Sequence, residues 1–218
     1  MAVSTRERII AEALRLFAER GYAATAVAEI EAGAGLSPGA GGLYRHFRSK
    51  EEVLAAAVAA RSETTQDELA ATLLGDGIGS ESDPLPLRLR RVCKAGLRKV
   101  SEEQQLLRVL FRDLDQFPYL VDTVRDHLTD PTYRALADWL SRQPELAASD
   151  ADWHAAATVL GGAIVNHWLA SSQVHSPPLD VDEERFISAW VRLALGLVAP
   201  PPIDPAADQA ANVTVSSG

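Results

Sequence analysis

Hydrophobic residues recur three and four positions apart along nearly the whole chain, and no alternation of period two extends beyond a few residues. This spacing predicts amphipathic α-helices rather than strands. The first helix is predicted to begin at Ser4, because Ser4 and Glu7 have the spacing of a capping box, and to stop at Gly21 in a left-handed cap. Its apolar stripe comprises Ile9, Ile10, Ala13, Leu14 and Phe17. The chain is therefore predicted to be all-α.

Two shorter helices follow within the first fifty residues. One is expected to start after Thr25 and to stop at Gly35. The next is expected to open with Ser37 as its N-cap and Pro38 at the first helical position, where the missing N–H costs nothing, and to run to Tyr44. The sequence thus predicts a three-helix domain over residues 1–50.

The rest of the chain is predicted to be a helical body over residues 51–199. A long helix should run from Lys50 to about Leu74 and end in the Gly- and Ser-rich loop 75–84. Further helices are expected at about 85–103, 104–115, 118–143, 150–173 and 182–199, with a kink or break at Asp130-Pro131. Residues 200–218 are rich in Pro and Ala and are predicted to form a disordered tail.

Composition and charge narrow the class of protein. The chain of 218 residues is 47% hydrophobic, which suffices for a buried core. It has no apolar run long enough to span a bilayer and no signal-like N-terminus, so we expect a soluble, cytoplasmic protein. Its one cysteine, Cys93, can form no intramolecular disulfide and leaves no thiol cluster for zinc; we expect it to be a small buried residue.

The distribution of charge is more informative than the net charge of −9. Residues 1–50 carry seven basic and five acidic side chains, and the stretch from Ser37 to Lys50 contains no acid. Such local asymmetry favours a polyanion there, because phosphate binding is dominated by Lys and Arg.

Two short helices joined by a turn at Gly35 are typical of a helix-turn-helix, which sends its second helix into the major groove of DNA. The glycines would let the backbone approach DNA and would weaken the helix, so we expect packing of Leu43 and Phe47 to order it. The alternative is a surface helical hairpin with a solvated basic face. The candidate DNA-binding residues are Ser37, Gly39, Gly41, Tyr44, Arg45, His46 and Lys50.

Three segments carry a resemblance to a known family: Thr5-Arg-Glu-Arg-Ile-Ile-Ala-Glu-Ala-Leu-Arg-Leu-Phe-Ala-Glu-Arg-Gly-Tyr22, Ala34-Gly-Leu-Ser37 and Leu43-Tyr-Arg-His-Phe-Arg-Ser-Lys-Glu-Glu52. Over these residues the chain resembles the N-terminal domain of the tetracycline-repressor (TetR/AcrR) family of bacterial transcriptional regulators. The resemblance implies a homodimer of all-α subunits, each with a DNA-binding head and a divergent helical body that binds a small effector. It also implies that Tyr44, His46 and Lys50 contact DNA.

The chain departs from the family pattern at one place. The family has about three residues between the Ser of the turn and the Leu-Tyr pair, whereas Pro38-Gly-Ala-Gly-Gly42 supplies five here. Two extra residues would rotate a helix face by about 200°. Base-contacting positions before Leu43 therefore cannot be assigned by counting from the family.

The body shows wide apolar stripes on its last two predicted helices, and Gly161-Gly-Ala163 would let another helix come close. Two such helices from each subunit would form a four-helix bundle, with a monomer as the alternative. The predicted dimer contacts are Val159, Ala163, Phe186, Trp190, Leu193 and Leu197. Aromatic side chains with a few polar neighbours suggest a pocket for a mostly apolar molecule. The predicted ligand contacts are Leu107, Phe111, Tyr133, Trp139, Asn166 and His167.

No catalytic, phosphate-binding, dinucleotide or metal-ligand motif is recognisable, so neither an enzyme, a cofactor nor a metal site is expected. The favoured hypothesis is a transcriptional regulator, most simply a repressor, that binds a palindromic operator as a homodimer and is released by a small effector. The alternative hypothesis is a helical small-molecule-binding or interaction protein with a weak or non-functional DNA-binding head.

Overall fold

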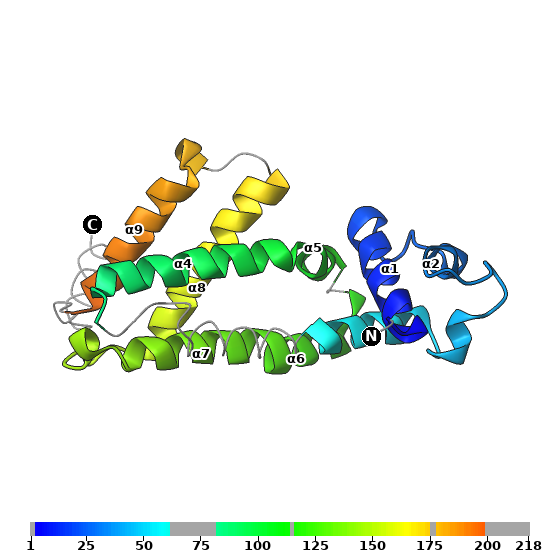
Figure 1. Ribbon diagram of the computed structural model, residues 1–218, viewed down its shortest axis with the longest axis horizontal. Coiled ribbons are helices and arrows are strands. Elements are labelled where there is room, and N and C mark those ends of the chain that lie inside the picture. The colour runs from blue at the N-terminus through cyan, green and yellow to red at the C-terminus, as the bar shows by residue number, and fades with distance from the viewer. Residues whose placement is uncertain (1–2, 62–81, 114–115, 175–177, 199–218) are drawn as a thin grey trace, which may run out of the picture.

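The computed structural model describes residues 3–61, 82–113, 116–174 and 178–198. Across these ranges the secondary structure is helical, with no strand, which confirms the all-α prediction. The N-terminal helices form a head at one end of an elongated molecule, and the remaining helices form the body (Figure 1). The predicted tail at 200–218, most of the predicted loop at 75–84 and the end of the long helix predicted before it lie outside the described residues.

Helix α1 (Thr5–Arg20) begins at the predicted capping box. The Ser4 hydroxyl accepts a hydrogen bond from the Glu7 backbone N–H at 3.2 Å, and the Ser4 backbone N–H donates to the Glu7 carboxylate at 2.7 Å. This reciprocal pairing satisfies backbone donors that the first helical turn would otherwise leave unpaired. The helix ends at Gly21, whose φ of 97° only glycine adopts readily, although its ψ of 154° is extended rather than left-handed helical.

Helix α2 (Val27–Gly33) follows, and a helix that we call the linker helix starts at residue 50 and is described to residue 61. Between them the predicted third helix is wrong: residues 38–41 form turns, and a single 3₁₀ turn, η1 (Leu43–Arg45), comes next. Gly39 and Gly41 both have φ of 73°, in the left-handed region. Two left-handed residues only two positions apart cannot belong to one α-helix, which explains the correction.

The body helices lie close to their predicted ranges. They are α4 (Leu85–Glu102), α5 (Gln104–Asp113), α6 (Pro118–Val124), α7 (Asp130–Ser141), α8 (Trp153–Leu169) and α9 (Glu183–Leu195). A π-helical turn, Arg125–Thr129, joins α6 to α7 just before the Asp130-Pro131 pair where a break was predicted. Short turns Pro144–Leu146, Ala170–Val174, Pro178–Asp180 and Gly196–Val198 complete the described body.

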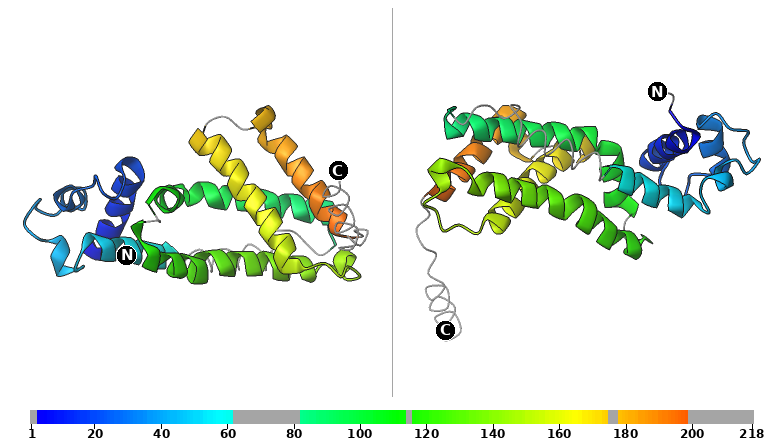
Figure 2. Two further views of the ribbon diagram at one scale, coloured as in Figure 1. Left: turned by 180° about the vertical axis from the view of Figure 1, so that it is seen from behind. Right: turned by 60° about the horizontal axis from the view of Figure 1, so that its bottom comes forward.

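Helices α8 and α9 lie side by side at the end of the body away from the head, and α4 and α7 run along its length (Figures 1 and 2). The buried side chains form two clusters. One joins α1, α2, η1 and the linker helix to α5 and α6, and the other joins α4, α7, α8 and α9. The head core therefore continues beyond residue 50 into two helices of the body. No helix in the described ranges is both long enough and apolar enough to cross a membrane.

Candidate nucleic-acid interface

The candidate interface is built on α2 and the chain that follows it. The turn after α2 is closed by a hydrogen bond from the Leu36 N–H to the Glu31 carbonyl at 2.8 Å, and Gly35 has φ of 74° there. We call residues 37–47 the recognition segment, since they occupy the place of the second helix of a helix-turn-helix. The segment is held to the core by Leu43 and Phe47, whose exposed fractions are 0% and 2%. The expected packing of these two side chains is confirmed.

The outer side of the recognition segment presents polar side chains. Tyr44 is 56% exposed, and Arg45 and His46 beside it are exposed as well. Ser37 and Gly39 are exposed and Gly41 is half-buried, so these six predicted residues share one short surface segment. Phenol, guanidinium and imidazole groups supply hydrogen bonds to phosphates and base edges.

Lys50 stands apart from the other six. Its ammonium donates to the backbone carbonyls of Tyr22 at 2.7 Å and Thr25 at 2.9 Å, and it lies 4.2 Å from the centre of the Tyr22 ring. Burial lowers the pKa of this ammonium. Lys50 thus ties the start of the linker helix to the turn between α1 and α2, and its predicted contact with phosphate stays a prediction.

One residue of this site was missed in the sequence. Glu31, on α2, is fully buried, and its carboxylate accepts hydrogen bonds from the Gly39 N–H at 2.7 Å and the Leu43 N–H at 3.0 Å. The available signal was its position: Glu31 follows Val27 by four residues and therefore continues the apolar stripe of a short helix. A carboxylate on that stripe needs a partner.

The head is clamped to the body by two neighbouring residues at the end of α5. The Arg112 guanidinium donates to the Phe17 and Ala18 carbonyls at the end of α1. The buried carboxylate of Asp113 accepts the Tyr22 N–H at 3.2 Å. The Tyr22 ring also packs edge-on against Phe117, with ring centres 4.5 Å apart. Movement of α5 would therefore displace the end of α1 and the turn that follows it.

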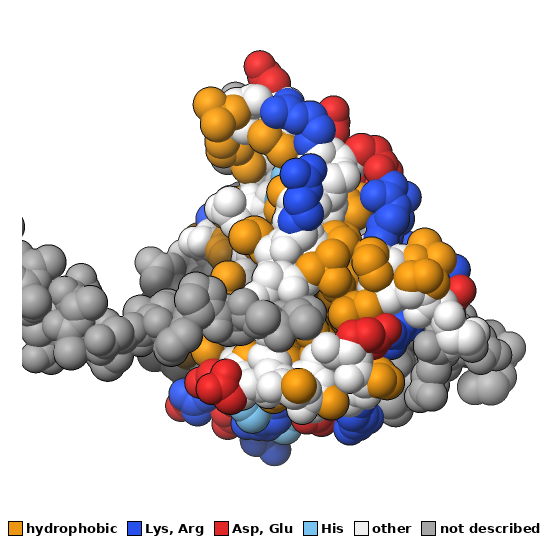
Figure 3. Space-filling model, turned by 90° about the vertical axis from the view of Figure 1, so that its left-hand side faces the viewer, with side chains coloured by type: hydrophobic (Ala, Val, Ile, Leu, Met, Phe, Trp, Pro, Cys, Tyr) orange, Lys and Arg blue, Asp and Glu red, His pale blue; other side chains and the backbone are white. Residues whose placement is uncertain are grey.

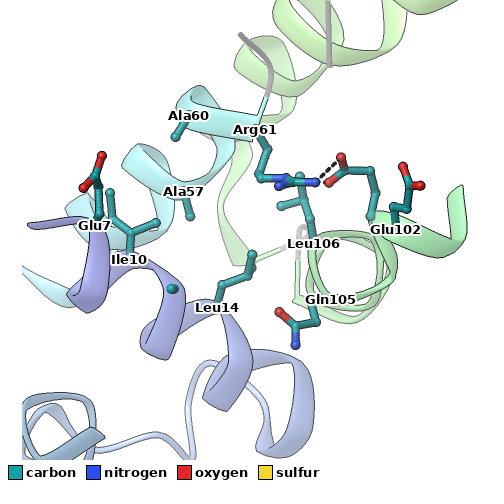
Figure 4. Close-up of a pocket in the computed structure, with 11 residues that line it drawn as sticks. Glu7, Ile10, Leu14, Ala57, Ala60, Arg61, Glu102, Gln105 and Leu106 are labelled. Carbon is teal, nitrogen blue, oxygen red and sulfur yellow. Dashed lines mark hydrogen bonds and ion pairs between the residues drawn. The ribbon is translucent and has the colours of Figure 1, made fainter. Parts of the chain in front are cut away.

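A pocket of about 270 Å³ opens at the same junction, between α1, the linker helix and the corner of α4 and α5 (Figure 4). Ile10, Leu14 and Leu106 form apolar walls, and an ion pair between Arg61 and Glu103 lies at its edge. Burial alone would raise the pKa of Glu103, but hydrogen bonds from Arg61 and Lys99 outweigh it and lower the pKa.

None of the predicted ligand contacts lines this pocket. Trp139 lies in the body core, whereas Phe111 is 58% exposed. Leu107 is half-buried, while the buried face of α5 packs against the head. Asn166 is exposed, and the His167 ring stacks on Phe186 with centres 4.2 Å apart.

Tyr133 packs against α8 at Gly161, where an added Cβ would lie 2.5 Å from its ring. This explains the small residue at that position: it allows α7 to approach α8, as the glycine pair predicted.

The predicted dimer contacts fall into three groups by exposure. Val159 on α8 and Leu193 on α9 are 68% and 66% exposed, and a Cβ at Gly162 would meet nothing within 4 Å. Ala163, Phe186 and Leu197 are half-buried. Trp190 is only 1% exposed, and its indole N–H donates to the Leu160 carbonyl at 2.8 Å, so it belongs to the core of the single chain. Figure 3 views the end of the body away from the head, where hydrophobic side chains lie at the surface beside basic ones.

Cys93 is fully buried, as expected, and burial raises the pKa of its thiol to about 12. The thiolate, which is the reactive form, is therefore scarce at neutral pH. The described residues contain no cluster of three or more side chains arranged to hold a metal ion.

The head at one end of the helical body has α2, the turn at Gly35 and the recognition segment in the order of a helix-turn-helix, with turns and the 3₁₀ turn η1 in place of its second helix. Residues 9–57 match the family of bacterial regulatory proteins named tetR. This match covers the head and the start of the linker helix.

Individual proteins are similar to the head in sequence or to the whole chain in fold. The chain is 50% identical over 52 residues to the uncharacterized HTH-type transcriptional regulator YerO of Bacillus subtilis; the match covers 24% of this chain and 17% of that protein. A structure from Mesorhizobium loti assigned to TetR-family transcriptional regulators has a TM-score of 0.69 at 18% identity, covering 88% of this chain and 95% of that one. E. coli NemR in its reduced form has a TM-score of 0.68 at 18% identity, covering 91% and 100%. Sequence likeness is thus strongest in the head, while the fold is shared over most of the chain.

Proposed function

We propose that this regulator binds a palindromic operator as a homodimer, acts as a repressor, and is released when a small, mostly apolar effector binds. The observation that carries the proposal is the exposed row Tyr44, Arg45 and His46, set on a segment whose Leu43 and Phe47 are locked in the head core. An exposed donor row on a rigid support is what base and phosphate recognition requires.

The homodimer is supported by the exposed apolar face of α8 and α9. Val159 and Leu193 are large apolar side chains that remain about two-thirds exposed in the single chain. Two copies related by a two-fold axis would bury the same face on both sides. A two-fold dimer presents two recognition segments, and so fits half-sites about one DNA turn, or a multiple of it, apart.

The release step is supported by the junction between head and body. Arg112 and Asp113 fix α5 to the end of α1 and to Tyr22. An effector that binds one arrangement of these helices better than the other would shift the population of heads able to match both half-sites. The junction pocket, whose walls include Leu14 of the head and Leu106 of the body, gives such a ligand a place to act.

The operator claim is tested by fluorescence anisotropy with duplexes selected from a random library by the purified chain. Arg45→Ala should lower affinity for the selected duplex by about tenfold or more if Arg45 contacts a base, since a bidentate contact contributes roughly 1–3 kcal/mol. The matched control is Arg134→Ala, an exposed arginine on α7, paired with Asp130 at 3.0 Å, which should leave affinity unchanged. Equal affinity for all three proteins would refute the role of the recognition segment.

The second candidate is a helical ligand-binding protein whose head has lost operator recognition. It is favoured by one observation, the absence of an α-helix in the described recognition segment. The two functions differ in the effect of Tyr44→Ala. If the protein binds an operator, this substitution should abolish its preference for the selected duplex. If the head has lost operator recognition, the unmodified protein should already show no preference between duplexes.

A further inference from the structure

Glu31 connects α2 to both parts of the inserted sequence. Its two carboxylate oxygens accept from different residues: Oε2 from the Gly39 N–H, within the turns, and Oε1 from the Leu43 N–H, at the start of η1. The residue has an exposed fraction of 0%. One buried side chain therefore holds the second residue of the five-residue stretch Pro38–Gly42 and the residue that directly follows the stretch.

Burying a carboxylate is costly unless its oxygens are hydrogen-bonded, so this arrangement has to be satisfied by the chain around it. Both oxygens act as acceptors, which is the pattern of an ionised carboxylate. Charge-assisted hydrogen bonds to backbone N–H groups are roughly twice as strong as neutral ones. The two bonds replace the intrahelical bonds that an α-helix would have provided over this stretch.

The geometry also shows how the two extra residues are accommodated. In a continuous helix they would turn the following face by about 200°, and Leu43 would leave the core. Instead, Gly39 and Gly41 with φ of 73° form turns that take up the additional length, and Leu43 and Phe47 remain buried. Gly39 has open space around it, so the turns stand out from the head surface.

We propose that Glu31 is a positioning residue for DNA recognition: it fixes the inserted turns in one non-helical shape and thereby sets the direction in which Tyr44, Arg45 and His46 face the bases. This inference rests on the proposed operator binding. It adds that the recognition element is a carboxylate-braced loop rather than a helix, and that sequence preference depends on a residue which does not touch DNA.

The test is Glu31→Gln, which keeps the size of the side chain but turns one acceptor into a donor that faces a backbone N–H. Hydrogen–deuterium exchange of the Gly39 and Leu43 amides should accelerate by about tenfold or more. Affinity for the selected operator should fall by a similar factor, while affinity for an unrelated duplex should change little and the variant should remain folded. Glu31→Asp, which is one methylene shorter, should behave in the same way.

The matched control is Glu29→Gln. It removes the same charge from the same helix, but the Glu29 carboxylate bonds to the Ala26 N–H and Arg20 and not to the recognition segment. It should leave exchange at Gly39 and Leu43 unchanged.

Continued protection of those amides in Glu31→Gln would overturn the brace. Accelerated exchange with an undiminished operator preference would overturn the positioning role, and so would an equal loss of affinity for the operator and the unrelated duplex. If the unmodified chain prefers no duplex, both the proposed function and the positioning role are refuted. The exchange measurement is independent of DNA and still decides whether Glu31 holds the Gly39 and Leu43 amides.

Discussion

At the scale of single residues, the head contains charged groups that are used inside the protein rather than on its surface. Glu31 and Lys50 both lie close to the recognition segment, and both form their hydrogen bonds with backbone groups. Glu31 binds two N–H groups of the recognition segment, and Lys50 binds two carbonyls of the turn after α1. Together they hold the two sides of the head that flank α2.

Lys50→Met keeps the length of the aliphatic chain and removes the ammonium. We expect the free energy of unfolding to fall by about 1–3 kcal/mol, because two hydrogen bonds from a charged group are lost. The salt dependence of DNA binding should keep its slope, since the ammonium is already occupied by the Tyr22 and Thr25 carbonyls. Urea unfolding and anisotropy across a salt series measure the two effects.

The control is Arg48→Met, at an exposed position two residues before Lys50. It should change stability by less than about 0.5 kcal/mol and reduce the salt slope by about 0.9 if Arg48 contacts a phosphate. A Lys50→Met protein of unchanged stability and reduced slope would show that Lys50 is a phosphate contact, as the family resemblance implies.

At the scale of elements, sequence reasoning succeeded where the determinant is local. The Ser4 capping box and the proline at the first position of α6 mark helix starts through local sequence alone, and both starts lie at the predicted positions. The helix predicted for the recognition segment was wrong because the shape of this segment depends on Glu31, which lies eight residues before Gly39 and twelve before Leu43. It also depends on two glycines that adopt φ of 73°. Neither dependence is visible in a pattern of period 3.6.

The same distinction applies to the other sites. Hydrophobic spacing grouped the exposed side chains Val159 and Leu193 with Trp190, which lies on α9 with Leu193 and is buried. The predicted ligand residues of the body were chosen by residue type, and the junction pocket is formed instead by helices far apart in sequence. Tertiary packing decides both which of these side chains are exposed and where the pocket lies.

The contact between the linker helix and the α4–α5 corner should be sensitive to acid. The pKa of Glu103 is lower in the folded protein than its ordinary value of 4.5, so the folded state resists its protonation. The stabilisation is fully present above that ordinary value and is lost as the pH falls through the folded pKa. Glu103→Gln should therefore be less stable than the unmodified chain at neutral pH and should lose less stability on acidification.

Chemical unfolding at a series of pH values measures this effect. Glu102→Gln, the exposed neighbour paired with Arg98 at 3.7 Å, is the control and should follow the unmodified chain. Parallel stability curves for Glu103→Gln and the unmodified chain would contradict the assigned role of this ion pair.

At the scale of the whole molecule, the head shares one of the two buried clusters with α5 and α6 of the body, and α8 and α9 carry the exposed apolar side chains Val159 and Leu193. The head core includes Leu106, Leu110 and Phe117 from α5 and α6. Packing of this kind transmits small displacements of body helices to the head, because close-packed interiors deform little. Helices α8 and α9 lie at the end of the body away from the head (Figure 1), so the proposed dimer contact and the proposed DNA-binding segment are separate surfaces.

Leu193→Glu tests the use of that face. A charge placed on a 66% exposed leucine should leave the single chain folded, but it should raise the dissociation constant of the dimer by at least about tenfold, because a buried interface does not accept an unpaired charge. Sedimentation velocity across a concentration series measures the change. Val121→Glu on α6, at 43% exposure, is the control; an unshifted equilibrium for Leu193→Glu would place the dimer contact elsewhere.

The recognition segment, braced by Glu31, is proposed to read a specific DNA sequence as part of a two-fold dimer. The most direct measurement is anisotropy of the selected duplex and of an unrelated duplex, at low and at physiological salt, with the stoichiometry determined in the same titration. We predict two chains per duplex, a dyad-symmetric site and a preference that persists as salt rises, because base contacts survive when counterion release weakens. Equal binding to both duplexes that disappears together with rising salt would contradict the account.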